Sequence, residues 1–376
     1  MTRRLPSSAP VLPGLAYVRP LGSGGFADVF LYQQDMPRRQ VAVKVLPADE
    51  RDPELLRMFN AEADVLAHLS AHPSIVTVYQ AGISADGRPY IVMEYCPGSL
   101  AQRYRIERLP VEEVMATAVQ LAGALESAHR AGLIHRDIKP SNILVTTFGS
   151  SVLADFGISA SLLRQPADEL LAMSVPWSAP EVVGEHTSGT VASEVWSLGA
   201  TVYSLLAGHS PFERREKGQN SRDQLRRRIS RATFVPVPRA DVPDGLQQVL
   251  ATAMAREPEA RYASTREFGE AVREVQRGLG LAPTALEVPA AEWMPERIDL
   301  DDASARGPVR SRLPQEGRRR AASGIDEITH RRRDEDTDIS GADESRAPVW
   351  PWVLAAVAAL VVVASTIAIV VVVGAG

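Results

Sequence analysis

The chain has 376 residues, of which 45% are hydrophobic and 23% are charged, and its formal net charge is −5 at pH 7. This length and composition allow one large or two modest domains, so a wholly disordered chain is excluded. The negative net charge gives nucleic-acid binding no support, because nucleic-acid-binding proteins present a basic surface. The single cysteine, Cys96, excludes an internal disulfide, and no cysteine–histidine cluster has zinc-site spacing, which together favour a reducing compartment such as the cytosol.

The first part of the chain is predicted to be a tail followed by a small β-rich lobe. Residues 1–14 lack the continuous apolar stretch of an export signal and are assigned to the tail. The runs ADVFLYQQ, QVAVKVL and PYIVMEY are rich in β-branched and aromatic residues and predict strands within residues 15–95. One helix interrupts them, because Asp52 is a candidate N-cap, Pro53 suits the first helical position, and apolar residues follow at helical spacing.

After Gly98 the pattern becomes helical. The segments VEEVMATAVQLAGALESAHRAG and SEVWSLGATVYSLLAG have apolar residues at helical spacing, and each ends with a glycine suited to a helix C-terminus. Residues 98–277 are therefore predicted to form a larger helical lobe, and the two lobes together give an α+β fold class.

Residues 278–349 are predicted to be a disordered juxtamembrane linker. The apolar periodicity fades there into proline, arginine, acidic residues and serine, with few aromatics. Mixed charge runs of this kind are usually solvated, and a phosphorylated docking segment or contact with acidic lipid head groups is the alternative.

Residues 350–373 are predicted to be one transmembrane helix. The stretch from Trp352 to Val373 carries no charge, and at about 1.5 Å per residue it reaches roughly 33 Å, enough to cross a bilayer core. A buried helix of a soluble core, the alternative, would need a protein cage around a surface with no polar face. The expected location is the cell membrane, with a single pass, a cytoplasmic catalytic domain and residues 374–376 outside. This orientation follows from the positive charge before the span, at Arg318–Arg320 and Arg331–Arg333.

A glycine-rich turn, LGSGGFADV, occupies residues 21–29. Glycines in such a turn let backbone N–H groups approach phosphate oxygens, although an ordinary hairpin has the same composition. A dinucleotide fingerprint would be followed by a helix and a parallel strand, whereas this turn continues into two strand-like runs. The dinucleotide interpretation is therefore excluded.

Lys44 lies in the apolar run VAVK, where a lone lysine usually marks an edge or solvent-facing position. The helix that follows supplies a partner, because Glu62 has Phe59 and Leu66 at i−3 and i+4 and so lies on the inward face. An inward carboxylate requires a cation. Lys44 and Glu62 are therefore predicted to form an ion pair.

The stretch HRDIKPSN, residues 135–142, follows a predicted helix and precedes ADFG at residues 154–157. Together they supply two metal-binding oxygen ligands, one separate carboxylate and a lysine, to which Lys44 adds a second cation. Such a set can neutralise a polyphosphate and orient an alcohol for in-line attack.

With these motifs in place, the chain resembles the eukaryotic-type serine/threonine protein kinases, especially the bacterial membrane-anchored members. The resemblance covers about residues 15–277 and rests on GSGGFADV, VAVK, Glu62, HPSIV, IVMEY, HRDIKPSN, DFG, SAPE, EVWSLG and REPEARYAS, in the family's order. It implies a bilobal fold with an N-lobe of about 15–95 and a C-lobe of about 98–277. It also implies ATP as cofactor, magnesium (with manganese as the alternative metal), and serine or threonine residues of proteins as substrates.

The resemblance implies roles for single residues as well. Asp137 would accept or orient the substrate hydroxyl proton, and Lys139 would stabilise the transferring phosphate. Asn142 and Asp155 would hold magnesium. The residues expected around ATP are Leu21, Gly22, Ser23, Gly24, Gly25, Val29, Ala42, Lys44, Glu62, Met93, Glu94 and Cys96. Within that set, Lys44 would contact the α- and β-phosphates of ATP, and Met93 would line the back of the adenine pocket. The backbone of Glu94 and Cys96 would form hydrogen bonds with adenine.

Five further positions match residues with structural or regulatory roles in the family: Arg136, Ser174, Glu181, Glu194 and Arg261. The resemblance implies that Glu181 forms an ion pair with Arg261. The chain departs from the family at two positions, because Ala27 stands where many kinases have a third glycine and Glu194 replaces the usual aspartate. The aspartate normally anchors the backbone of the catalytic loop, and one extra methylene could shift that anchor.

The activation loop is the largest departure. Between Leu162 and Met173 it contains no serine, threonine or tyrosine. In kinases with an arginine before the catalytic aspartate, the position of Arg136 here, that arginine commonly binds a phosphothreonine of this loop. We hypothesise that Asp168 and Glu169 supply standing negative charge to Arg136, and two solvated loop acids are the alternative.

The favoured function is that of an active membrane-anchored serine/threonine kinase. A catalytically silent pseudokinase scaffold is the alternative, and nucleotide binding without phosphate transfer would distinguish it. A lipid or small-molecule kinase is disfavoured, because SVPWSAPE resembles a peptide-docking loop. The linker also allows self-association and autophosphorylation, for which the candidate sites are Ser323, Thr329 and Thr337.

Overall fold

The computed structural model describes most of the predicted catalytic domain, namely residues 6–23, 27–46, 63–64, 66–156, 175–214, 216 and 218–289. Several predictions fall outside these residues. They concern Gly24, Gly25, Glu62, Asp168, Glu169, Ser174, the linker beyond 289 and the membrane span 350–373. Within the part of the chain that is described, no helix is both long enough and apolar enough to cross a membrane.

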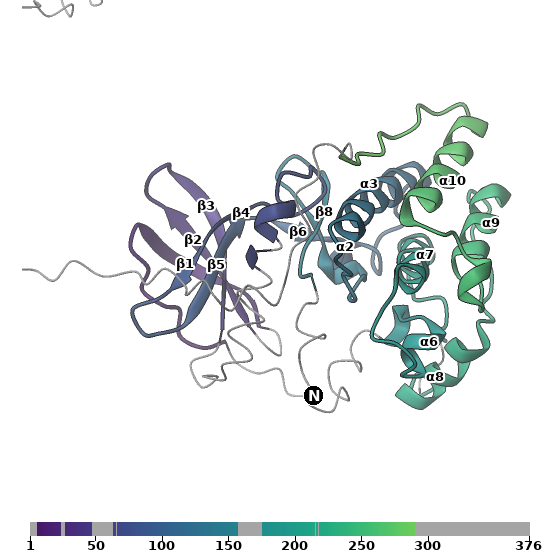
Figure 1. The fold of residues 1–376 in the computed structure, drawn as a ribbon, viewed down its shortest axis with the longest axis horizontal. Helices are drawn as coiled ribbons and strands as arrows, with labels where there is room; N and C mark the ends of the chain where they lie inside the picture. The colour runs from purple at the N-terminus through teal and green to yellow at the C-terminus, as the bar shows by residue number, and fades with distance from the viewer. Residues whose placement is uncertain are drawn as a thin grey trace, which may run out of the picture. The chain divides into compact units, whose positions relative to one another are not determined.

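The N-terminal lobe contains a five-stranded antiparallel sheet in the order β1-β2-β3-β5-β4, drawn in purple and blue in Figure 1. Its strands are β1 (Leu15–Ser23), β2 (Asp28–Gln34), β3 (Arg39–Val45), β4 (Val78–Ile83) and β5 (Pro89–Glu94). The bounds of β2, β3 and β5 confirm the three strands predicted from β-branched and aromatic residues.

Alternation along β3 separates two apolar clusters, because successive side chains of a strand point to opposite faces. Val41, Val43 and Val45 pack in a cluster that belongs to the N-lobe alone. Ala42 joins the other, larger cluster, which continues into the helical lobe. Lys44 is two residues after Ala42, so its side chain lies on the same face of β3, toward the junction of the lobes.

Part of the predicted N-terminal tail packs on the N-lobe. Leu12 is buried in the cluster of the three β3 valines, and the Tyr32 hydroxyl donates to the carbonyl of Pro10 at 2.6 Å. The N–H and the hydroxyl of Ser7 donate to Asp28 Oδ2 at 2.8 and 2.6 Å. The packed N-lobe therefore begins before residue 15.

The C-terminal lobe is helical, as predicted. Its helices are α2 (Leu100–Arg103), α3 (Val111–Arg130), α6 (Pro180–Val183), α7 (Val191–Ala207), α8 (Arg222–Arg231), α9 (Asp244–Ala253) and α10 (Thr265–Gly278). The described residues of this lobe also form a small sheet of β6 (Gly98–Ser99), β7 (Ile143–Val145) and β8 (Ser151–Leu153). Short 3-10 segments there are η1 (Pro140–Asn142), η2 (Val175–Trp177) and η3 (Pro258–Ala260).

The predicted glycine ends of α3 and α7 are confirmed. Gly132 follows α3 with φ of 84°, and Gly208 caps α7 with φ of 79°. Both values lie in the left-handed region that glycine enters without steric cost. Of the helix predicted after Asp52, the described residues 63–64 and 66–69 are helical, and Leu66 is buried.

The loop before β4 connects the lobes through the backbone. Val76 N–H donates to the carbonyl of Leu153 at 3.0 Å, and Leu153 N–H donates to the carbonyl of Ser74 at 2.9 Å. Leu153 ends β8, so the segment that leads to Asp155 is bonded to the N-lobe side of the junction.

The chain stays packed beyond the predicted end of the kinase domain. Residues 279–289, here named the post-α10 segment, run back alongside α3 in green in Figure 1. Leu281 and Leu286 pack against the large apolar cluster. The sequence placed these residues in the linker, because an extended segment has no helical periodicity to detect.

Candidate active site

The end of β1 and the start of β2 form the described part of the glycine-rich turn. Gly22 lies opposite Val29 and Ser23 lies opposite Asp28 in the antiparallel register. The Ser23 hydroxyl donates to Asp28 Oδ1 at 2.6 Å, and Asp28 is fully buried. A side chain at Gly22 would meet no atom of the described residues within 4 Å. The described base of the turn is thus anchored by the hydrogen bond between Ser23 and Asp28.

The predicted adenine-pocket residues lie where β3 and β5 pair. Ala42 lies opposite Met93, and both are buried. Partly buried side chains pack around the same cluster, among them Leu21, Val29 and Cys96. Burial raises the pKa of the Cys96 thiol to about 12, so the thiol stays protonated and acts as an apolar wall. The N–H of Glu94 donates to the carbonyl of Thr77 at 2.8 Å.

Lys44 and Asp155 meet across the junction of the lobes. Lys44 Nζ lies 3.1 Å from Asp155 Oδ1, and their side chains are 15% and 55% exposed. The charge of Lys44 is the largest influence on Asp155 and holds the pKa of its carboxyl below the usual range. Asp155 has φ of 58°, a left-handed conformation that aspartate tolerates better than most residues. The predicted partner, Glu62, lies outside the described residues.

The catalytic-loop residues converge on Asp137. Lys139 Nζ lies 2.7 Å from Asp137 Oδ2. Asn142 Nδ2 donates to the same carboxylate oxygen at 2.9 Å and to the carbonyl of Asp137 at 2.8 Å. The turn of η1 makes this possible, because the Asn142 N–H bonds back to the carbonyl of Lys139 at 3.0 Å. Three residues that the sequence analysis assigned to one site therefore touch one another.

Buried His135 holds the loop and the segment before Asp155 together. Its Nδ1 accepts the N–H of Asp137 at 3.2 Å, so its Nε2 carries the ring proton and donates to the carbonyl of Ala154 at 3.2 Å. Burial lowers the pKa of His135, which keeps this neutral form. Its ring centroid lies 4.5 Å from that of Phe156.

Glu194 reaches the catalytic loop despite its extra methylene. Its Oε1 accepts the N–H of Arg136 at 2.5 Å, and its Oε2 lies 2.6 Å from His129 Nε2. Burial alone would raise the pKa of Glu194, but the hydrogen bond and charge of His129 and the Arg136 N–H hold it below the usual value. His129 is the partner that sequence reasoning missed, and its position in the last turn of α3 was the available signal.

Arg136 adopts a left-handed backbone with φ of 67°. Its Nε and Nη1 atoms are buried and have no hydrogen-bond partner among the residues that the structure describes. Burial lowers the pKa of the guanidinium, and Glu194 partly opposes this effect. A buried cation with unfilled donors is an anion-accepting position.

Glu181 and Arg261 form a bidentate ion pair. Arg261 Nη1 and Nη2 donate to the two oxygens of Glu181 at 2.6 and 2.9 Å. The same guanidinium donates to three backbone carbonyls, those of Ala192, Ala255 and Arg256. The pair therefore joins α6 to the segment around η3 and leaves no donor of Arg261 unfilled.

The oxygen donors of Asn142 and Asp155 fit magnesium, which prefers hard oxygen ligands. No cluster of three or more histidine, cysteine, aspartate or glutamate side chains with metal-site geometry occurs within the described ranges. A metal at this junction would therefore depend on the carboxamide and on phosphate oxygens as well as on the carboxylate. A sheet-based lobe and a helical lobe that bring two lysine–aspartate pairs together are the architecture of a protein-kinase-type domain.

Comparisons with known proteins agree with this class. A family model described as "Protein kinase domain" matches residues 15–271. The chain therefore belongs to the protein kinase family, and bacterial proteins named serine/threonine-protein kinases are among its relatives.

Three relatives from Mycobacterium tuberculosis illustrate the similarity. PknK is 39% identical over 282 residues, which cover 73% of this chain and 25% of PknK. PknI is 33% identical over 331 residues, 81% of this chain and 52% of PknI. PknL is 32% identical over 310 residues, 79% of this chain and 72% of PknL. The chain thus spans about a quarter of PknK and about half of PknI.

The fold agrees with a solved structure as well. The crystal structure of a point mutant of the M. tuberculosis PknI kinase domain superposes with a TM-score of 0.53 at 31% identity and covers 72% of this chain and 99% of that chain. The bilobal prediction is therefore confirmed.

Proposed function

We propose that the chain is an active serine/threonine protein kinase that transfers the γ-phosphoryl group of ATP to protein hydroxyls at a membrane. The observation that carries the proposal is the convergence of Lys139 and Asn142 on Asp137, beside the Lys44–Asp155 pair. These described residues, which would handle phosphate, metal and hydroxyl, support the proposal because they lie close together where the two lobes meet.

The two lysine–aspartate pairs suit the binding of phosphate and a metal ion. When bound, ATP supplies the phosphoryl group and magnesium neutralises charge on its phosphates. Asp155 and Asn142 would present oxygen ligands to the metal, and Lys44 would contact phosphate oxygens. Asp155 is 55% exposed and so accepts a new ligand without unfolding its surroundings.

Asp137 orients the substrate hydroxyl and accepts its proton. Lys139 lies against that carboxylate and is placed to stabilise negative charge on the transferring phosphoryl group. His135 and Glu194 hold the loop backbone from two sides, so the carboxylate of Asp137 is positioned before substrate arrives.

The test of transfer uses the full-length chain, ATP, magnesium and a generic protein substrate, with phosphates mapped by mass spectrometry. Wild type is expected to modify serine or threonine, and Asp137→Asn is expected to be slower by about 10²–10⁴-fold, the usual contribution of a general base. Transfer by both proteins at the same rate would disprove the role of Asp137.

A pseudokinase scaffold is the second candidate. The observation in its favour is the buried guanidinium of Arg136 with unfilled donors among the described residues. Nucleotide binding by wild type with no transfer would establish it.

If Asp168 and Glu169 supply the negative charge for Arg136, the double variant Asp168→Asn with Glu169→Gln should lower turnover. Unchanged turnover would reject that hypothesis.

Membrane attachment by residues 350–373 is proposed from the uncharged sequence of that stretch. Replacing Leu360 and Val363 by arginine places two charges in the span, each costing about 2.5–3.5 kcal/mol at a helix centre. The variant is expected to leave the membrane fraction. Release of wild type by salt washing would contradict the proposal.

A further inference from the structure

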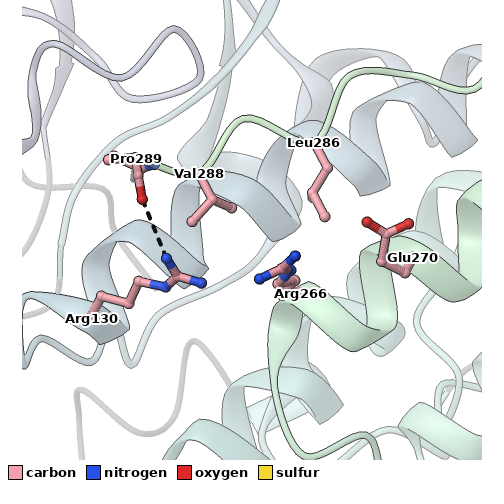
Figure 2. Close-up of a pocket in the computed structure, with 6 residues that line it drawn as sticks. All are labelled: Arg130, Arg266, Glu270, Leu286, Val288 and Pro289. Carbon is pink, nitrogen blue, oxygen red and sulfur yellow. Dashed lines mark hydrogen bonds between the residues drawn. The ribbon is translucent and has the colours of Figure 1, made fainter. Parts of the chain in front are cut away.

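The post-α10 segment contacts both lobes, although it takes no part in the site described above. Gln276 is 2% exposed, and its Oε1 accepts the N–H of Thr284 while its Nε2 donates to the Thr284 hydroxyl, both at 2.9 Å. Arg130 Nη1 donates to the carbonyl of Pro289 at 3.3 Å, as Figure 2 shows. The segment is thus bonded to the helical lobe at both ends.

Between these two ends the segment forms one wall of a pocket of about 230 Å³. Figure 2 shows this pocket with its other wall on α3 and α10. The lining residues are Arg130, Arg266, Glu270, Leu286, Val288 and Pro289. Leu286 also lies against α10, because a Cβ added at Gly269 would come within 2.9 Å of its Cδ1.

Gly123 marks the point where the segment crosses α3. A Cβ added there would collide with the carbonyl oxygen of Glu287 and would lie 3.2 Å from its nitrogen. Glycine inside a helix costs about 1 kcal/mol relative to alanine. The close backbone approach of Glu287 gives the physical reason for glycine at this position.

His72 connects the same residue to the N-lobe side. It lies in the loop before β4, is 8% exposed, and its Nδ1 accepts the N–H of Ser74 at 3.0 Å. Because that nitrogen is an acceptor, Nε2 carries the ring proton and donates to the carbonyl of Glu287 at 2.9 Å. The neutral imidazole of His72 therefore uses both ring nitrogens, one as acceptor from Ser74 and one as donor to Glu287.

The bonds continue from His72 to the metal-binding acid. The carbonyl of Ser74 accepts the N–H of Leu153, which ends β8, and Val76 N–H donates back to Leu153. Asp155 lies two residues after Leu153, the last residue of β8. One unbroken series of contacts thus runs from Glu287 to the segment that carries Asp155.

We propose that the post-α10 segment is a positioning element for catalysis, and that His72 transmits its docking through the loop before β4 to Asp155. The inference deepens the proposed kinase function and rests on it. When the segment is displaced, the loop loses the Glu287 carbonyl and β8 loses part of its support, so Asp155 is held less firmly for the metal.

Gly123→Ala tests the inference in the full-length chain. The added methyl group displaces Glu287 while it favours the helix, so docking is lost without a weaker α3. Hydrogen exchange of residues 279–289 is expected to rise, and kcat is expected to fall by about five-fold, the lower end of common coupling between sites. Gly278→Ala is the matched control, because a side chain there meets no atom of the residues that the structure describes within 4 Å.

Two substitutions of His72 separate transmission from packing. His72→Gln retains an N–H donor that can extend to the Glu287 carbonyl, whereas His72→Asn reproduces only the acceptor for Ser74. We expect kcat to be higher for His72→Gln than for His72→Asn, at equal amounts of folded protein.

The outcomes distinguish the two proposals. Faster exchange in Gly123→Ala with unchanged kcat would overturn the positioning role, and unchanged exchange would overturn the docking itself. If wild type transfers no phosphate, the proposed function fails, whatever the exchange data show.

Discussion

The pairs Glu181–Arg261 and Lys44–Asp155 both join segments that are distant in the sequence, but their surroundings differ. The Arg261 side chain is 0% exposed and all its donors are used by Glu181 and by backbone carbonyls. Asp155 is 55% exposed, and its Oδ1 lies 3.1 Å from Lys44 Nζ. The first pair is closed to further ligands, whereas the second can accept one.

We therefore expect the Glu181–Arg261 pair to stabilise the fold and the Lys44–Asp155 pair to serve catalysis. A buried pair with filled donors is costly to break, because one charge is left without compensation. A partly exposed pair is worth little to stability, because water screens it. Mutation should therefore affect stability at the first pair and activity at the second.

The largest effect is expected at Glu181. Glu181→Ala leaves Arg261 buried without a carboxylate and should lower the free energy of unfolding by about 3–5 kcal/mol. Chemical denaturation of the full-length chain measures this change. The double variant Glu181→Ala with Arg261→Met removes the stranded charge and should recover part of the loss. A change below about 1 kcal/mol would show that the pair behaves as a surface pair.

A nearly equal effect, on activity instead of stability, is expected at Lys44. Lys44→Met retains the apolar stem and removes the phosphate-binding charge, so kcat/KM should fall by about 10²–10³-fold. The free energy of unfolding should change by less than about 1 kcal/mol, as for an exposed pair. Steady-state kinetics and denaturation of the same sample check both values. A large loss of stability would remove the distinction between the two pairs.

Glu194 lies between these extremes, because it is buried but supports the catalytic loop. Glu194→Asp shortens the side chain, which then no longer reaches both Arg136 N–H and His129 from this backbone. We expect a loss of about 1.5 kcal/mol of stability, the lower range for a hydrogen bond to a charged group, together with slower turnover. A variant as stable and active as wild type would show that the extra methylene has no function.

The smallest effect concerns pH. Burial lowers the pKa of His72 below its usual 6.5, so the folded protein binds fewer protons there than the unfolded chain. This contribution to stability is complete above pH 6.5 and declines as pH falls toward the folded pKa, by at most about 1.4 kcal/mol per pH unit. Urea denaturation between about pH 7.5 and 5.5 should show a shallower decline for His72→Asn. Equal slopes would contradict the neutral ring.

The strands and the central residues of the site were predictable from local patterns. The alternation in QVAVKVL predicted the strand that carries Lys44, and the spacing in HRDIKPSN brought Asp137, Lys139 and Asn142 together. These features depend on short-range geometry, which the sequence contains directly.

The features that sequence reasoning missed depend on contacts between distant segments. Nothing near Glu194 indicates that His129 completes its hydrogen bonds. Gly123 looks like an ordinary helix glycine until the carbonyl of Glu287 is placed above it. Extended segments such as the one around Ser7 also lack periodicity, so their packing depends on a surface formed elsewhere in the chain.

In the proposed function, Asp155 would hold the metal ion that accompanies ATP in addition to lying beside Lys44. Calorimetric titration of ATP into wild type and Asp155→Asn, each with and without magnesium, tests it most directly. We expect magnesium to tighten ATP binding to wild type, whereas Asp155→Asn should retain metal-free binding and lose the magnesium effect. An equal magnesium effect in both proteins would contradict the claim.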